Sequence, residues 1–201
     1  MADIYTNPEL YDAIHKNYNW DQSLITSIAK KTGGPILELA AGTGRLAKKL
    51  LDYGFDYTGI DTSVEFLDVA IKTYGKQGTF LLRDMRKFNL GKQFRFIFIG
   101  FNSFLHNLTD NDALNCLRSV YHHLCDDGIF LVSIFKPDPS FLYRTKGKLY
   151  PATSTFDYKG TRCQIMESNL FDEKNQINYL FWELESNGTL GEEKYEYKMR
   201  M

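Results

Sequence analysis

A glycine-rich turn between a predicted strand and a predicted helix is the first place in the sequence where chemistry can occur. The turn reads Gly42-Thr43-Gly44 and follows the apolar run Pro35–Ala40. Glycine lets the backbone turn tightly and approach a ligand closely, and the start of the next helix presents free N–H groups. A lone Gly-x-Gly turn is weak evidence for a binding site, so its weight depends on what accompanies it.

Further residues able to bind a ligand follow the next three predicted strands. Asp61 ends the second strand, Asp84 follows the third, and Phe101-Asn102-Ser103-Phe104-Leu105-His106 follows the fourth. Because the carboxyl ends of parallel strands lie side by side, we expect these residues and the glycine turn to line one crevice. Four such features at successive strand ends predict a binding site for a nucleotide-type cofactor.

The elements that must position these residues lie in residues 34–136. This region alternates short apolar runs with amphipathic stretches, which is the pattern of βα repetition. Right-handed crossovers then give an α/β fold: a Rossmann-like, doubly wound, mostly parallel sheet with helices on both faces. We predict Asp110 as the cap of the last helix. The predicted strands are 35–40, 57–61, 79–82, 94–101 and 129–135, and the predicted helices are 45–51, 64–74 and 110–124.

The flanking regions have different patterns. Residues 1–33 are predicted to be helical, over 8–15 and 23–30, and we expect them to fold over the crevice as a lid. Residues 137–201 alternate in strand fashion over 162–170, 176–184 and 194–199, which predicts a C-terminal antiparallel β meander. We expect both regions to belong to one domain together with the core 34–136.

Composition limits the classes of function. The chain has 201 residues, of which 43% are hydrophobic and 24% charged, as in an average soluble domain. A net charge of -1 provides no positive field for a nucleic acid, so we expect none as a partner. No apolar run could span a bilayer and Met1–Tyr5 does not begin a signal peptide, which predicts a cytoplasmic protein without membrane contact. The cysteine and histidine spacings predict no metal site.

Residues 35–135 resemble the class I S-adenosylmethionine-dependent methyltransferases. The run Glu38-Leu39-Ala40-Ala41-Gly42-Thr43-Gly44-Arg45 is similar to the ELAxGTGR motif of the small-molecule members, and Asp84-Met85 is similar to their acidic-Met pair after the third strand. Residues 83–88 and the run FNSFLHNL resemble sugar-amine N-methyltransferases. The resemblance implies an enzyme that uses S-adenosylmethionine to methylate a small molecule, on nitrogen in preference to oxygen.

The resemblance also implies which residues bind the cofactor. The loop at Ala40, Gly42 and Gly44 would admit its methionine part, and Glu38 would act on the loop and the ammonium group. Asp61 would accept hydrogen bonds from both ribose hydroxyls. The resemblance also implies that Asp84 accepts a hydrogen bond from the adenine amino group and that the Met85 N–H lies on the adenine ring. Phe101 would close over the cofactor.

On the acceptor side, the resemblance places Asn102 and His106 against the methyl acceptor. We predict that His106 accepts or relays the proton that an amine must lose before it can attack. Tyr11 and Trp20 are candidates to close the pocket from the helical lid.

Two other functions fit part of the sequence. A nicotinamide dinucleotide is the alternative cofactor, because residues 42–47 also fit G-x-G-x-x-A and Asp61 follows 17 residues after Gly44. Glu38 inside the strand, Asp84-Met85 and the lack of a separate substrate domain argue against that oxidoreductase. The second alternative is a protein that binds S-adenosylmethionine or S-adenosylhomocysteine without turnover.

The C-terminal region departs from the family pattern. Members of this fold normally end with a helix and an antiparallel pair of strands that complete the sheet, whereas the residues after Phe135 form the meander. Either the meander supplies those strands, or the chain is a shortened form in which the fifth strand keeps an exposed edge. Unpaired edges invite pairing with another chain, so we predict a homodimer or an aggregation-prone monomer.

Overall fold

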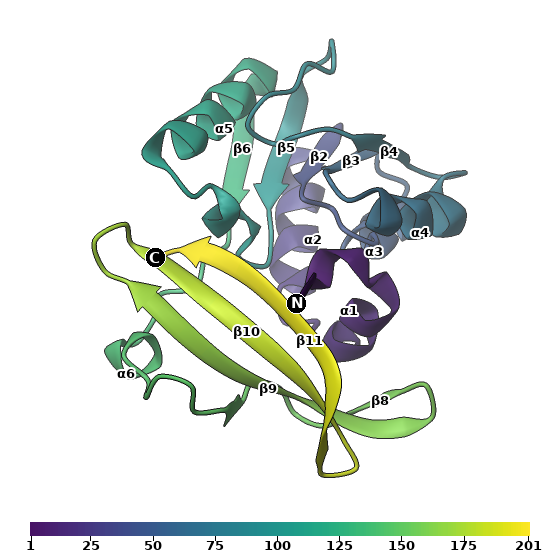
Figure 1. The fold of residues 1–201 in the computed structure, drawn as a ribbon. Coiled ribbons are helices and arrows are strands. Elements are labelled where there is room, and N and C mark those ends of the chain that lie inside the picture. The colour runs from purple at the N-terminus through teal and green to yellow at the C-terminus, as the bar shows by residue number, and fades with distance from the viewer. The chain divides into compact units, whose positions relative to one another are not determined.

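The computed structural model describes all residues from 1 to 201 (Figure 1). They form two compact units, one of residues 18–134 and the other of residues 1–17 together with 135–201. The helical segment 1–33 is therefore divided between the two units. None of the helices combines the length and the apolar character that crossing a lipid bilayer requires.

The unit of residues 18–134 contains a five-stranded parallel sheet with the strand order β4-β3-β2-β5-β6. Leu39 at the end of β2 pairs with Ile60 in β3 and with Ile99 in β5, so these strands end level with one another. This sheet confirms the predicted α/β class. Its strands are β2 (Ile36–Leu39), β3 (Tyr57–Asp61), β4 (Thr79–Leu82), β5 (Phe94–Ile99) and β6 (Leu124–Val132).

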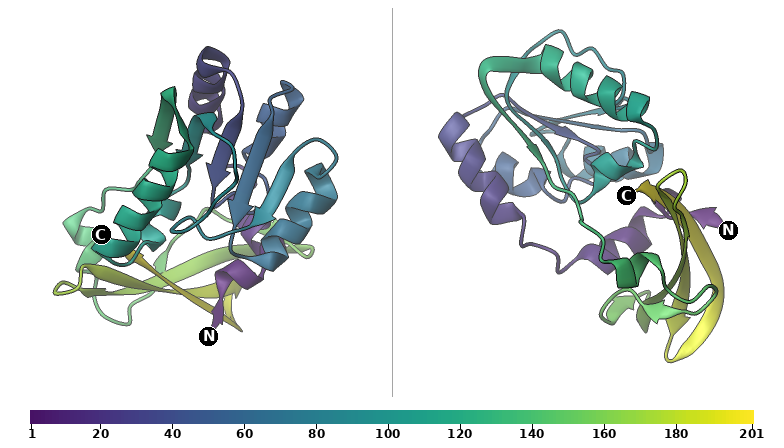
Figure 2. Two further views of the ribbon diagram at one scale, coloured as in Figure 1. Left: turned by 90° about the horizontal axis from the view of Figure 1, so that it is seen from above. Right: turned by 90° about the vertical axis from the view of Figure 1, so that its left-hand side faces the viewer.

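Helices cover both faces of the parallel sheet (Figure 2). The helices are α2 (Gln22–Thr32), α3 (Ala47–Asp52), α4 (Val64–Tyr74) and α5 (Asp110–His123). Successive strand residues point to opposite faces, so Ile36 packs in the core with α2, α3 and α4, whereas Leu37 packs in the core with α5. Burial of both faces explains why β2 and β5 are almost entirely apolar.

The other unit contains a six-stranded sheet with the order β1-β11-β10-β9-β7, to which β8 adds by pairing with β9. All pairings are antiparallel except that of β1 with β11. The predicted meander is confirmed as β9 to β11. The elements are β1 (Ala2–Asp3), η1 (Ile4–Thr6), α1 (Pro8–His15), α6 (Pro139–Leu142), β7 (Tyr150–Pro151), β8 (Phe156–Tyr158), β9 (Thr161–Asp172), β10 (Ile177–Ser186) and β11 (Thr189–Arg200).

Several predicted boundaries were wrong. Strands β5 and β6 end at Ile99 and Val132, two and three residues earlier than predicted. The cap of α5 is Thr109 and not Asp110, because the Thr109 hydroxyl accepts the Asp112 N–H at 3.0 Å. The fifth strand was predicted to start at Ile129, whereas β6 already starts at Leu124 and shifts its register along β5. Helix α3 starts at Ala47, two residues later than predicted.

The edge of the parallel sheet lies at β6. The C-terminal strands form a sheet of their own and do not pair with β6, which has β5 as its one strand neighbour. The meander therefore does not add strands to the parallel sheet, and its fifth strand has one unpaired edge. An edge strand has a row of backbone N–H and C=O groups without strand partners, which can template pairing with another chain.

We predict self-association through the β6 edge. Light scattering over a range of protein concentrations should give a mass that rises from one chain toward two, because pairing at an edge follows mass action. A mass that stays at one chain at the highest concentration would contradict this prediction.

Candidate functional site

Four neighbouring strands of the parallel sheet have their carboxyl ends at one edge of the sheet. Each is followed by a segment that the sequence analysis assigned to the ligand-binding crevice. Strand β2 leads into the glycine turn, β3 ends at Asp61, β4 is followed by Asp84, and β5 is followed by Phe101. The structure thus brings the predicted cofactor residues to the carboxyl ends of β2 to β5, where ligands bind in folds of this class.

The glycine turn has left-handed backbone at three positions. The φ angles are 57° at Ala40, 56° at Gly42 and 86° at Gly44. A Cβ atom at Gly44 would lie 2.9 Å from a ring carbon of Tyr74, so both the angle and the space require glycine there. The turn therefore has a fixed conformation, in which glycine backbone without side chains lies at the carboxyl ends of the strands.

The Asp61 carboxylate joins the glycine turn to the segment that leads into α4. Its Oδ2 accepts the Gly42 N–H at 2.8 Å and its Oδ1 accepts the Ser63 N–H at 2.9 Å. The Ser63 hydroxyl in turn accepts the Phe66 N–H and caps α4. Since a carboxylate oxygen has two lone pairs, each oxygen of Asp61 retains one that these two bonds do not use.

Glu38 is buried, with 3% of its surface exposed. The Tyr57 hydroxyl donates a hydrogen bond to its Oε2 at 2.5 Å. Burial raises the pKa of Glu38 to about 8, since it disfavours the charged form, although the Tyr57 hydrogen bond and the charge of Arg45 oppose the shift. Gly59 makes this pairing possible, because a Cβ atom there would lie 2.9 Å from the Tyr57 hydroxyl oxygen.

Arg45 connects the glycine turn to the segment before α2, and the sequence analysis did not assign it to the site. Its guanidinium donates to both carboxylate oxygens of Asp21, at 2.9 and 2.6 Å, and to the Tyr18 carbonyl at 2.9 Å. It also lies over the ring of Phe101, 4.9 Å from the centroid. Arg45 could have been assigned to the site from the sequence, because it belongs to the glycine motif. Nothing in the sequence around Asp21 indicated that this residue would pair with Arg45.

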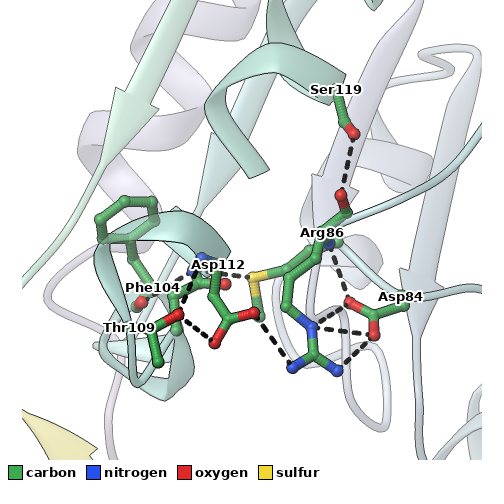
Figure 3. Close-up of polar contacts among 8 residues, drawn as sticks. Asp84, Arg86, Phe104, Thr109, Asp112 and Ser119 are labelled. Carbon is green, nitrogen blue, oxygen red and sulfur yellow. Dashed lines mark hydrogen bonds and ion pairs between the residues drawn. The ribbon is translucent and has the colours of Figure 1, made fainter. Parts of the chain in front are cut away.

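Asp84 is held by a second arginine (Figure 3). The Arg86 side chain donates to both oxygens of the Asp84 carboxylate at 2.5 to 3.0 Å, and the Arg86 backbone N–H donates to Oδ1 at 2.8 Å. The hydrogen bonds from Arg86 hold the pKa of Asp84 below its usual value, so the side chain is ionised at neutral pH. Arg86 was also missed, although it directly follows the Asp84-Met85 pair.

The segment after β5 is strained. Phe101 and Asn102 have φ angles of 52° and 66°, and neither residue is glycine. Left-handed backbone costs about 1–3 kcal/mol at a residue such as Phe101, whereas asparagine adopts it more readily, and strain of this kind gathers at functional sites. The Tyr18 ring packs edge-on against Phe101 with 5.7 Å between centroids, which helps to hold the segment in place.

The next residues form the short helix η2 (Ser103–His106). His106 is half-buried at its end. Asn107 is buried; its Nδ2 donates to the Phe104 carbonyl at 2.9 Å, while its Oδ1 has no hydrogen-bond partner. A buried amide oxygen without a partner is costly, so it marks a place where a donor from a ligand or water would be stabilised.

Tyr11 and Trp20 do not share a unit. Tyr11 belongs to α1 in the unit of residues 1–17 and 135–201, where its ring lies 4.1 Å from that of His15. Trp20 belongs to the unit of the parallel sheet, and 62% of its surface is exposed. Their role in closing a pocket stays a prediction.

Polar side chains are also buried on one face of the antiparallel sheet, which the sequence analysis did not single out. Glu167 accepts the Trp182 indole N–H at 2.7 Å and an Arg144 N–H at 2.9 Å, and burial raises its pKa. Asn169 donates to Asn178 at 2.9 Å, which leaves the Asn169 Oδ1 and the Asn178 Nδ2 without partners. The signal was an acid and an amide at inward positions of an alternating strand.

The part of the chain that contains the candidate site also matches known proteins. Residues 36–128 match the family model described as "Methyltransferase domain". The chain is 34% identical over 131 residues to YqeM of Bacillus subtilis (strain 168), which is named a methyltransferase, covering 62% of this chain and 52% of the relative. It is 32% identical over 163 residues to a glycine/sarcosine N-methyltransferase of Halorhodospira halochloris, covering 78% of this chain and 59% of that protein.

The fold has a close counterpart among solved structures. The CcbJ methyltransferase from Streptomyces caelestis superposes with a TM-score of 0.75 at 22% identity, over 98% of this chain and 81% of that chain. At this identity the likeness establishes the fold. The chain spans little more than half the length of the two curated relatives above.

We predict that Glu38 makes the stability of the chain depend on pH. Because its folded pKa of about 8 lies above the usual value, the folded state keeps a proton that the unfolded state loses between about pH 4.5 and 8. The free energy of unfolding should therefore fall as pH rises through this window, by at most about 1.4 kcal/mol per pH unit from this group. Denaturant unfolding of the wild type and of Glu38→Gln measures this.

The glutamine variant cannot lose a proton, so it provides the control for all other titrating groups. Its stability relative to the wild type should rise from pH 5 to pH 8 and then level off. Two stability curves that stay parallel across this range would contradict the prediction.

Proposed function

This chain belongs to the class I S-adenosylmethionine-dependent methyltransferases, and we propose that it transfers a methyl group from S-adenosylmethionine to an amine nitrogen of a small molecule. The observation that carries the proposal is the arrangement at Asp61. Its two carboxylate oxygens are held by the N–H groups of Gly42 and Ser63, and each retains a lone pair. Two fixed acceptors on one carboxylate match the two neighbouring hydroxyls of a ribose.

The other residues at this edge fit the rest of the cofactor. The left-handed turn at Gly42 and Gly44 brings backbone without side chains next to Asp61, which suits the methionine part. On the other side of Asp61 in the sheet order, the ionised Asp84 offers acceptors for the adenine amino group, and the Met85 N–H is our candidate donor to the ring. Phe101 follows β5 and supplies an apolar face.

The bound cofactor supplies an electrophilic methyl group on a positively charged sulfur. The chain must then align the acceptor, exclude water and take up the proton that the amine loses. We assign the proton to His106, which is half-buried on η2, and the positioning of the acceptor to Asn102 in the strained turn before it. Trp20, which belongs to the same unit, is our candidate for an aromatic cover of the acceptor.

Two observations support an amine of small size as the acceptor. The relative from Halorhodospira halochloris is named a glycine/sarcosine N-methyltransferase. The net charge of -1 provides no general attraction for the phosphate backbone of a nucleic acid. The acceptor itself is to be found by screening small primary and secondary amines for release of S-adenosylhomocysteine.

We predict that Asp61 decides cofactor binding. S-Adenosylhomocysteine at about 100 times its dissociation constant should raise the Tm of the wild type by about 5–11 °C. Asp61→Ala and Asp61→Asn should lose this rise, since each removes at least one ribose acceptor. Asp68→Asn on the exposed side of α4 is the matched control and should keep it.

Parallel scans with NAD test the alternative cofactor. A Tm rise with NAD and none with S-adenosylmethionine or S-adenosylhomocysteine would overturn the proposed function. Circular dichroism of the Asp61 variants checks that a lost Tm rise does not reflect a lost fold.

We predict that His106 acts on the acceptor and not on the cofactor. With an amine found in the screen, His106→Gln should lower kcat by about 10²- to 10⁴-fold, the usual contribution of a general base. Its dissociation constant for S-adenosylhomocysteine should stay within about twofold of the wild type. An unchanged kcat would remove His106 from the proposed mechanism.

A further inference from the structure

Arg45 holds together three segments at the carboxyl edge of the parallel sheet, all within the unit of residues 18–134. It follows the glycine turn, and its two terminal nitrogens donate to the two carboxylate oxygens of Asp21 at 2.9 and 2.6 Å. One of these nitrogens also donates to the Tyr18 carbonyl at 2.9 Å. The guanidinium lies over the Phe101 ring, 4.9 Å from its centroid. One side chain thus ties the glycine turn to the segment before α2 and to the turn after β5.

Asp21 does not perform the role that its place in the chain suggests. It occupies the N-terminal cap position of α2, where an aspartate usually accepts a backbone N–H of the first helical turn, yet its side chain makes no capping bond. Both of its carboxylate oxygens are bonded to Arg45 instead. The chain therefore forgoes a cap on α2 and uses the carboxylate to hold Arg45.

The pair is largely shielded from water. The side chains of Arg45 and Asp21 are 21% and 6% exposed. Exchange of a buried ion pair for apolar residues of similar volume is often neutral or stabilising, so stability is a poor explanation for a pair in such a place. A forked guanidinium and a carboxylate do fix orientation, because their two parallel hydrogen bonds form in one relative geometry.

The segments that Arg45 joins carry residues assigned to the methyl acceptor. Trp20 lies between Tyr18 and Asp21, the two bonded partners of Arg45, and is 62% exposed. Asn102 follows Phe101 in the left-handed turn that the guanidinium covers. A shift of the ion pair would therefore displace both segments.

We propose that Arg45 and Asp21 are positioning residues that hold Trp20 and Asn102 at fixed places against the methyl acceptor. This inference rests on the proposed function, in which Trp20 and Asn102 serve the acceptor. Methyl transfer needs the acceptor aligned with the methyl group, and a misplacement of about 1 Å can cost about 10²-fold in rate. The pair itself carries no net charge, so its removal leaves the charge of the cofactor side as it was.

The test replaces the pair by apolar residues in the double variant Asp21→Leu/Arg45→Met, which keeps the net charge of the chain. The matched control is Lys48→Met/Asp52→Leu. It removes an ion pair of 2.7 Å on α3 whose side chains are 63% and 55% exposed. Calorimetry gives the dissociation constant of S-adenosylhomocysteine, and steady-state kinetics give kcat/KM for an amine found in the screen.

A third measurement needs no acceptor. Time-resolved anisotropy of tryptophan fluorescence reports the motion of Trp20, because the chain has two tryptophans and the other, Trp182, is buried. Circular dichroism and thermal unfolding check that each variant is folded.

The double variant should lose about 10²-fold in kcat/KM for the amine. Its dissociation constant for S-adenosylhomocysteine should stay within about threefold of the wild type, because the exchange of the pair for apolar residues is close to neutral elsewhere. Trp20 should gain a nanosecond segmental motion that the wild type lacks. The control Lys48→Met/Asp52→Leu should change none of the three quantities.

Arg45→Lys keeps the test decisive if the double variant does not fold. Lysine keeps the positive charge but lacks the fork, so it cannot bond both oxygens of Asp21 and the Tyr18 carbonyl in the same geometry. Its kcat/KM should fall by about tenfold, between the wild type and the double variant, with the same affinity for S-adenosylhomocysteine.

An unchanged kcat/KM in a folded variant of the pair would overturn the inference. Equal losses in kcat/KM and in affinity for S-adenosylhomocysteine would overturn it too, since the pair would then act on the cofactor. Failure of the wild type to bind S-adenosylhomocysteine would instead overturn the proposed function, so the two failures are distinguishable.

Discussion

The carboxylate of Asp61 is the contact on which the shape of the site depends. It holds the glycine turn after β2 and the start of α4 after β3, through the N–H groups of Gly42 and Ser63. Both segments leave strands that end level in the sheet, so a short side chain can reach both. A carboxylate accepts hydrogen bonds and cannot donate them. The lone pairs of Asp61 that these two bonds do not use therefore suit hydroxyl and N–H donors of a ligand.

Two arginines complete the charge balance around this edge of the sheet. Arg45 pairs with the buried Asp21 and crosses the face of Phe101, and Arg86 pairs with Asp84 and with Asp112. Each arginine ties a strand end to a segment distant in sequence, before α2 in the first case and in α5 in the second. The segments that contribute to the site are thereby fixed by the chain's own contacts before any ligand binds, which lowers the entropy cost of binding.

Much of the fold followed from local patterns. The predicted bounds of β3, α4, β4 and α1 match the structure, because apolar periods and capping residues such as Ser63 define them locally. Helix α3 could not be placed in this way, since its cap position is Leu46 and no side-chain hydrogen bond marks its start. The strand ends with their acids were predictable, because parallel order alone brings them to one edge.

The contacts of those acids were not predictable. Glu38 reaches Tyr57 because Glu38 pairs with Gly59, whose missing side chain leaves room for the tyrosine hydroxyl. Such a contact depends on strand register and on a neighbour's absent side chain, and neither is a property of the motif. The pKa of Glu38 follows from the same burial, so its protonation at neutral pH was beyond reach of the sequence as well.

The cofactor side and the acceptor side of the proposed site differ in backbone strain and in buried polar groups without partners. On the cofactor side, positions with positive φ are mostly glycines and the carboxylates are held by short hydrogen bonds, so the backbone there carries little strain. On the acceptor side, Phe101 and Asn102 adopt left-handed backbone without glycine, and Asn107 buries an oxygen without a partner. The packing of Tyr18 and Arg45 on Phe101 offsets part of the cost of the left-handed backbone, and the cost at Asn107 remains. A ligand that gave Asn107 a donor would recover part of these costs, so binding near this segment is favoured by relief of a cost already present in the free chain.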